Sequence, residues 1–129
     1  MKIAVVGAHL SGLPLNGQLV ERNAKLVKTA RTKNVYKFYA LPGTVPPKPG
    51  LVRQSAPVSN GIEVEVWELG PAEFATFVDL IPPPLGIGTL ELEDGDLVKG
   101  FVVESYAVEG APEITSTGGW RNYMKSIGK

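Results

Sequence analysis

The sequence predicts an α+β protein in which a mixed sheet curls into a small barrel with flanking helices. Three observations favour this class: predicted strands outnumber predicted helices, hairpins alternate with longer crossover connections, and turn residues separate the apolar runs. The 15 glycines and 11 prolines indicate sharp turns rather than disorder, because apolar segments stand between them. A chain of 129 residues fits one core, so we expect a single domain over residues 1–129.

The first predicted element is a buried central strand. Residues 2–8, KIAVVGA, are β-branched and nearly all apolar. After a loop rich in glycine, the spacing predicts a helix over residues 16–27, with Asn16 as its cap and Leu19 and Leu26 on its apolar side.

The middle of the chain reads as strands joined by a proline-rich segment. Residues 35–41, VYKFYAL, alternate and are aromatic, which predicts a strand. Residues 42–50, PGTVPPKPG, predict a rigid surface loop, because each proline lacks a backbone donor. A short strand at 51–54 follows, and residues 61–69 show the clearest alternation in the chain.

The spacing of apolar residues then changes from the alternation of a strand to the period of a helix, and back again. Residues 70–84 carry apolar side chains at helical spacing until three consecutive prolines end the pattern. Residues 86–105 read as a hairpin with the two-residue turn Asp94–Gly95. The C-terminal segment 118–129 places Trp120, Tyr123, Met124 and Ile127 on one face of a closing helix.

Composition excludes several classes of function. Thirteen basic and 13 acidic residues cancel, so nothing in the charge favours nucleic acid or an anionic membrane. Without cysteine and with one histidine, the chain offers no thiol chemistry and no histidine-based zinc site, and we expect neither metal nor cofactor. The first apolar run is too short for a signal peptide or a membrane span, which predicts a cytoplasmic protein.

The loop after the first strand, GAHLSGLPLN, holds the only histidine. Backbone N–H groups near a helix start suit a carboxylate, and His9 adds a titratable imidazole, so we predict His9 as a catalytic acid or base. A histidine that merely packs a turn is the alternative. The predicted ligand-binding residues are Gly7, Ala8, Leu10, Ser11, Gly12, Asn16, Arg31 and Lys99.

Other charged or nucleophilic residues give weaker signals. Arg31 and Lys99 are candidates to pair with a bound carboxylate, and a solvated strand face is their alternative. Ser11 lacks the strained turn and the oriented base of a nucleophilic serine. The strand glutamates alternate with apolar residues and predict a solvated sheet face: Glu63, Glu65, Glu68, Glu91 and Glu93.

Several blocks of the sequence closely resemble the C-terminal domain of allophanate hydrolases. They include VVGAHLSGLPLNGQL, IPPPLGIGTLELEDG and ITSTGGWRNY, and the resemblance extends from Ile3 to about Tyr123. It implies a gamma-glutamyl cyclotransferase-like fold and a domain that stands alone, without the amidase domain. It also implies decarboxylation of N-carboxycarbamate in urea or allophanate degradation, with the histidine of the AHLSG loop, His9, as the leading residue.

Two alternative functions remain open. The domain is a candidate non-catalytic assembly or regulatory module that binds an amidase or a second copy of itself as a homodimer. It is also a candidate cyclotransferase, because that related family shares the fold. In that family a catalytic glutamate stands near the end of the middle helix, at a position that corresponds here to Pro82, so the sequence disfavours this chemistry.

Overall fold

The computed structural model describes all residues from Met1 to Lys129 and contains a mixed five-stranded sheet and a separate two-stranded sheet. The larger sheet has the order β2-β5-β1-β7-β6, and its strands are β1 (Lys2–Val5), β2 (Lys25–Arg31), β5 (Glu63–Glu68), β6 (Leu85–Glu91) and β7 (Leu97–Val103). The pair β1–β7 is parallel and the other pairs are antiparallel. The predicted α+β class is therefore confirmed.

The five-stranded sheet closes on itself into the predicted small barrel. Its two edge strands meet where Thr32 bridges Leu92, just beyond the ends of β2 and β6. Backbone hydrogen bonds from Lys33 to Glu91 and from Glu93 to Arg31, both of 2.9 Å, flank that bridge. This seam leaves neither edge fully unpaired at this end of the barrel.

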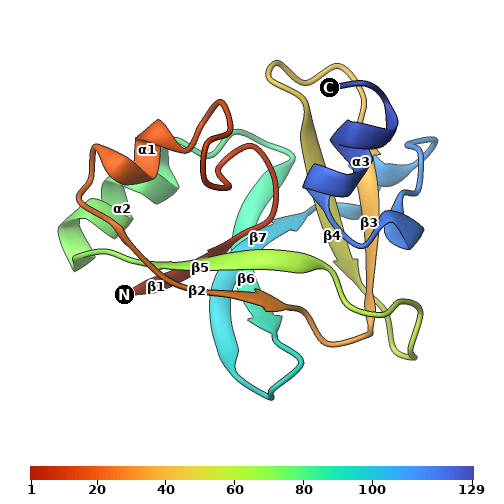
Figure 1. Cartoon of the computed structure of the whole chain (residues 1–129), viewed down its shortest axis with the longest axis horizontal. Helices are drawn as coiled ribbons and strands as arrows, with labels where there is room; N and C mark the ends of the chain where they lie inside the picture. Colours follow the sequence, from red (N-terminus) through yellow and green to blue (C-terminus); the bar gives the residue numbers. More distant parts are fainter.

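The two-stranded sheet consists of β3 (Tyr36–Leu41) and β4 (Lys48–Arg53), and β4 packs against β7. Figure 1 shows α1 (Gly17–Val20) and α2 (Pro71–Asp79) together on one side, while α3 (Trp120–Ser126) lies over β3 and β4. Two 3₁₀ helices, Ser105–Val108 and Thr115–Thr117, complete the fold. No helix is both long enough and apolar enough to cross a membrane.

The predicted helix over 16–27 is wrong beyond its first turn. Only Gly17–Val20 is helical, and Leu26 lies in β2 with 47% of its surface exposed. Asn23 has a φ of 58°, a left-handed conformation that ends the helical path. Residues 25–31 then pair with β5, so tertiary pairing outweighs the helical spacing of the leucines.

The other predicted elements hold, with shifted boundaries. The strand at 35–41 and the C-terminal helix are present, and α2 ends at Asp79, before the prolines. The predicted loop 42–50 is shorter, because β4 already begins at Lys48. The hairpin β6–β7 is also present, but residues 92–96 join its strands instead of a two-residue turn.

The glutamate-bearing face of β5 is not solvated as predicted. Glu65 and Trp67 are only 6% and 7% exposed, although Glu68 is exposed as expected. Glu65 is buried because other parts of the chain donate hydrogen bonds to its carboxylate, which satisfies it away from water.

Candidate functional site

The segment between β1 and α1, residues 7–16, folds back on itself and buries His9. The Leu10 N–H donates to the Gly7 carbonyl at 3.0 Å, and the Leu15 N–H donates to the Ala8 carbonyl at 2.9 Å. The Asn16 side chain donates to the His9 carbonyl at 2.9 Å. Asn16 therefore holds the loop that carries the histidine, and it does not cap α1 with its side chain.

The His9 ring lies between two phenylalanines at one end of the barrel. Its centroid is 5.1 Å from that of Phe77 on α2, edge-on, and 5.1 Å from that of Phe101 on β7. His9 Nε2 is 2.7 Å from Gln18 Oε1. With that oxygen as acceptor, Nε2 carries the proton and Nδ1 keeps its lone pair.

The environment of His9 favours the neutral imidazole. The residue is 7% exposed, and this burial lowers the pKa of His9 below its ordinary value of 6.5. The hydrogen bond with Gln18 raises the pKa and the positive charge of Lys48 lowers it, both less than burial does. At neutral pH the ring is therefore a base with a free Nδ1.

Two adjoining cavities reach the His9 ring. The inner one has a volume of about 20 Å³ and is lined by Gly7, Ala8, Lys48 and Pro49 among others. The outer one has a volume of about 150 Å³ and opens between Val45–Pro46 and the segment from Leu80 to Leu85. Both are lined by His9, Lys48, Leu85 and Phe101, so the ring lies beside a cavity rather than in a closed core.

Three residues that line the inner cavity have backbone N–H groups without acceptors. The backbone N–H groups of Gly7, Ala8 and His9 donate to no group of the protein. Lys48, at the start of β4, forms no ion pair. Buried N–H groups normally have partners, and successive free N–H groups beside a cation form an anion-binding concavity.

Other predicted donors of this loop are already used within the protein. Ser11 donates its N–H and its hydroxyl to Glu65 Oε1, at 2.8 and 3.0 Å. Leu10 N–H is bonded to Gly7, while Gly12 lies exposed at a turn with a φ of 77°. Of the predicted loop residues, the cavities beside His9 are lined by Gly7 and Ala8 and not by Leu10, Ser11, Gly12 or Asn16.

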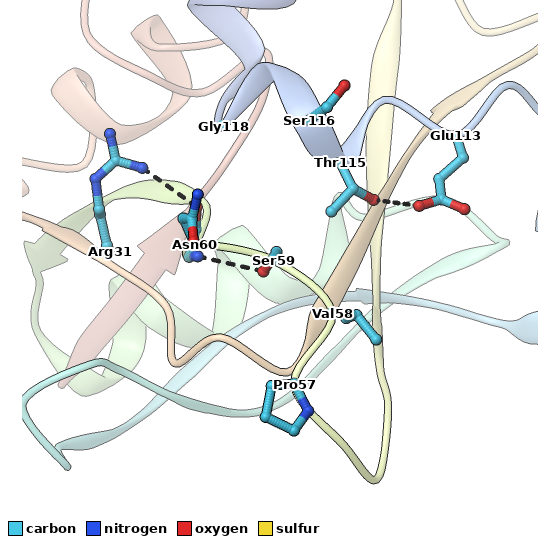
Figure 2. A pocket seen from close by; sticks show the side chains of 10 residues that line it. Arg31, Pro57, Val58, Ser59, Asn60, Glu113, Thr115, Ser116 and Gly118 are labelled. Atoms are coloured by element: carbon cyan, nitrogen blue, oxygen red, sulfur yellow. Dashed lines mark hydrogen bonds between the residues drawn. The ribbon is translucent and has the colours of Figure 1, made fainter.

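The structure does not bring Arg31 and Lys99 to His9. Arg31 lies at the end of β2 beside the largest hollow, about 830 Å³, where its Nη1 donates to the Gly61 carbonyl at 3.2 Å (Figure 2). Lys99 is exposed on β7 and donates to the Thr89 hydroxyl at 3.0 Å. Neither residue lines the cavities beside His9.

The sequence reasoning missed Lys48, Gln18 and the two phenylalanines beside His9. Lys48 stands inside the proline-rich run PPKPG, where a lysine is a departure from the turn residues around it. Phe77 belongs to the predicted apolar face of α2, but the helical spacing alone does not indicate that this face covers a histidine.

The fold and the buried histidine loop define a small α+β barrel protein with a gamma-glutamyl cyclotransferase-like architecture. An AIG2-like protein from Mus musculus shares this fold, with a TM-score of 0.60 at 20% identity over 89% of this chain and 86% of that one. A family model described as the allophanate hydrolase C-terminal domain matches residues 1–125. The chain belongs to the allophanate hydrolase C-terminal domain family.

Relatives of the chain differ greatly in length. The urea amidolyase of Lachancea kluyveri is 44% identical over 96% of this chain, which spans about 7% of that relative's length. The Kluyveromyces lactis allophanate hydrolase superposes with a TM-score of 0.93 at 43% identity, over 98% of this chain and 21% of that one. A uropathogenic E. coli-specific protein, c4763, gives 0.86 at 32% identity, over 96% and 94%. The first two relatives carry this domain as part of a larger enzyme.

Proposed function

We propose that the chain binds N-carboxycarbamate in the two adjoining cavities beside His9, with one carboxylate reaching into the inner cavity, and releases carbon dioxide from it. The observation that carries this proposal is that a lone imidazole, an unpaired lysine and three successive residues whose N–H groups have no acceptor line the same cavity. Membership in the allophanate hydrolase C-terminal domain family supports the choice of substrate class.

The cavity has the donors that a small acid requires. The N–H groups of residues 7–9 would donate hydrogen bonds to one carboxylate, and the Lys48 ammonium would offset its negative charge. No aspartate or glutamate lines either cavity, so no like charge opposes such a ligand there. His9 is the acid–base group left to move a proton.

The proposed reaction starts from the monoanion, in which one of the two carboxyl groups is protonated. His9 Nδ1 accepts the carboxyl proton and returns it to the substrate nitrogen. The bond between that carboxyl carbon and the nitrogen breaks, and its electron pair stays on the nitrogen. The products are carbon dioxide and carbamate, so atoms and charge balance. A neutral imidazole suits this proton transfer, and burial keeps His9 neutral.

A coupled assay tests the proposal. An amidase that cleaves allophanate generates N-carboxycarbamate in place, and carbon dioxide release is followed with and without the chain. We expect His9→Ala to abolish the acceleration while circular dichroism shows an intact fold. Lys48→Met should reduce it about tenfold or more. The matched control is Lys99→Met, because Lys99 is an exposed lysine away from His9. An unaltered rate in His9→Ala would overturn the catalytic proposal.

A second candidate function is an assembly or regulatory module for an amidase. The relatives that hold this domain inside larger enzymes favour it. It predicts that the chain binds an amidase and changes its activity equally well in wild type and His9→Ala. Sedimentation of the two proteins, together and apart, distinguishes this function and a homodimer from independent catalysis.

The cyclotransferase alternative receives no support from the cavity wall. Pro82 itself lines the outer cavity, and no carboxylate takes the place of the glutamate which that chemistry requires. If the protein released 5-oxoproline from a gamma-glutamyl amine, that result would support the cyclotransferase alternative.

A further inference from the structure

A partly buried ionic cluster outside the cavity holds the middle of the His9 loop. It consists of Ser11, Glu65 and Arg121, which come from the loop, from β5 and from α3. We call these three residues the Glu65 clamp. Glu65 is 6% exposed, whereas the Arg121 side chain is 39% exposed. The mechanism proposed above uses none of the three.

The clamp holds both the main-chain N–H and the main-chain carbonyl of Ser11. Glu65 Oε1 accepts from Ser11 N at 2.8 Å and from its hydroxyl at 3.0 Å. Arg121 Nη2 donates to the Ser11 carbonyl at 2.7 Å and to Glu65 Oε2 at 3.2 Å. The peptide groups on both sides of Ser11 are therefore oriented by charged partners, two residues after His9.

Each charged partner is itself anchored to the barrel. Trp67 Nε1 donates to Glu65 Oε1 at 3.1 Å, which fixes the carboxylate on its own strand. Arg121 follows Trp120, which is 2% exposed and lies edge-on to Phe38 of β3 with ring centroids 6.4 Å apart. The clamp thus joins the loop to the five-stranded sheet through Glu65 on β5, and to the two-stranded sheet through α3, which lies over β3 and β4 in Figure 1.

We propose that Glu65 and Arg121 are positioning residues for the His9 site. By fixing Ser11 they hold the turn from Gly7 to Leu10 so that its free N–H groups stay directed at one ligand. The Glu65 carboxylate accepts from the Ser11 N–H, so this N–H is not available to an external ligand, whereas the N–H groups of residues 7–9 have no acceptor within the protein. The ligand part of this inference rests on the proposed function.

Arg121→Met is the main test. It removes the hydrogen bonds of the guanidinium to Ser11 and Glu65 and leaves the buried Glu65 carboxylate without its ion pair, so circular dichroism and urea unfolding first establish that the variant folds. Ligand-free protein is examined first. We expect faster hydrogen exchange of the Ser11 amide and a shifted imidazole signal of the single histidine. Malonate, a stable dicarboxylate mimic, is then titrated, and its Kd should rise about tenfold or more. Arg121→Lys keeps one donor and should recover part of the affinity.

Arg53→Met is the matched control. Arg53 forms an ion pair of 2.9 Å with Glu91 on the barrel surface, away from the loop. It should leave the malonate Kd and the histidine signal within about twofold of wild type. Glu65→Gln is a second variant that keeps the shape of the side chain and should reproduce the effects of Arg121→Met.

The outcomes separate the clamp from the proposed function. If wild type binds no malonate, the anion site fails, and the clamp is judged by Ser11 exchange and the His9 signal alone. Unchanged exchange and an unchanged signal in Arg121→Met would overturn the clamp. An equal rise of the malonate Kd in Arg121→Met and Arg53→Met would also overturn it, because the loss of affinity would then reflect a general loss of protein stability.

Discussion

At the scale of single residues, His9 combines two roles that sequence reasoning treats as alternatives. Its ring packs between Phe77 and Phe101, as a structural histidine does, and it also lines a cavity. Gly7 allows this arrangement, because a Cβ at that position would overlap the ring of Pro49. The main chain at Gly7 therefore approaches Pro49 closely beside the inner cavity, which both residues line.

The buried His9 predicts a pH-dependent stability. Its pKa is lowered in the folded state, so the unfolded chain binds a proton more readily as the pH falls below 6.5. The stabilisation from this group is complete above that pH and is lost as the pH falls toward the folded pKa. We expect the Tm of wild type to fall between pH 7 and pH 5, and the Tm of His9→Gln to fall less.

An NMR titration of the only imidazole checks the same shift directly. Its midpoint in the folded protein should lie below 6.5, the ordinary value. A midpoint at or above that value would contradict the burial argument, and with it the neutral base on which the proposed mechanism depends.

At the scale of elements, the histidine site depends on how α2 is packed. Phe77 is fully buried and its ring centroid is 6.0 Å from that of Phe101, while Phe74 on the same helix is only partly buried. The helix therefore contributes Phe77 to the packing around His9 and Phe74 to the margin of the core.

Phe77→Ala should lower the free energy of unfolding by about 3–5 kcal/mol, because it removes a fully buried ring. Phe74→Ala is the matched control on the same helix and should cost clearly less. Urea unfolding measures both, and only Phe77→Ala should move the His9 signal. Equal losses in the two variants would show that Phe77 has no special place in the core.

Sequence periodicity predicted the strands and α2 correctly where the local pattern of apolar residues alone decides the structure. The alternation in residues 61–69 identifies β5 and its buried apolar face. It fails at Glu65, whose burial depends on Arg121, 56 positions later in the chain. It fails likewise at residues 25–31, where the leucine spacing predicts a helix but pairing with β5 makes a strand.

The candidate site was predictable only in part, because contacts between residues far apart in the sequence also build it. His9 is identifiable because it is the only imidazole, and glycines surround it. Lys48 becomes its neighbour because β3 and β4 form a hairpin that packs on β7, a long-range contact that no local pattern encodes.

At the scale of the whole molecule, barrel closure depends on a short seam around Thr32. This residue is 1% exposed, and its hydroxyl accepts from the Ile62 N–H at 3.0 Å and donates to the Lys33 carbonyl at 2.9 Å. The Thr32 side chain thus ties the end of β2 to the segment before β5, while the main chain at this position bridges to Leu92 at the end of β6.

Thr32→Val should lower the free energy of unfolding by about 1–3 kcal/mol, because it leaves the buried Ile62 N–H without an acceptor. Thr29→Val, an exposed position on β2, is the control and should be close to neutral. Urea unfolding measures the difference. A neutral Thr32→Val would mean that the seam adds nothing to the stability of the barrel.

Lys48 lies on the two-stranded sheet, whereas His9 lies on the loop that follows β1 of the five-stranded sheet, and this placement has a consequence for stability. A bound acid that contacts both Lys48 and His9 would connect the two sheets, which share no strand. Docking of the two sheets and occupation of the cavity would then be linked equilibria, so that each strengthens the other.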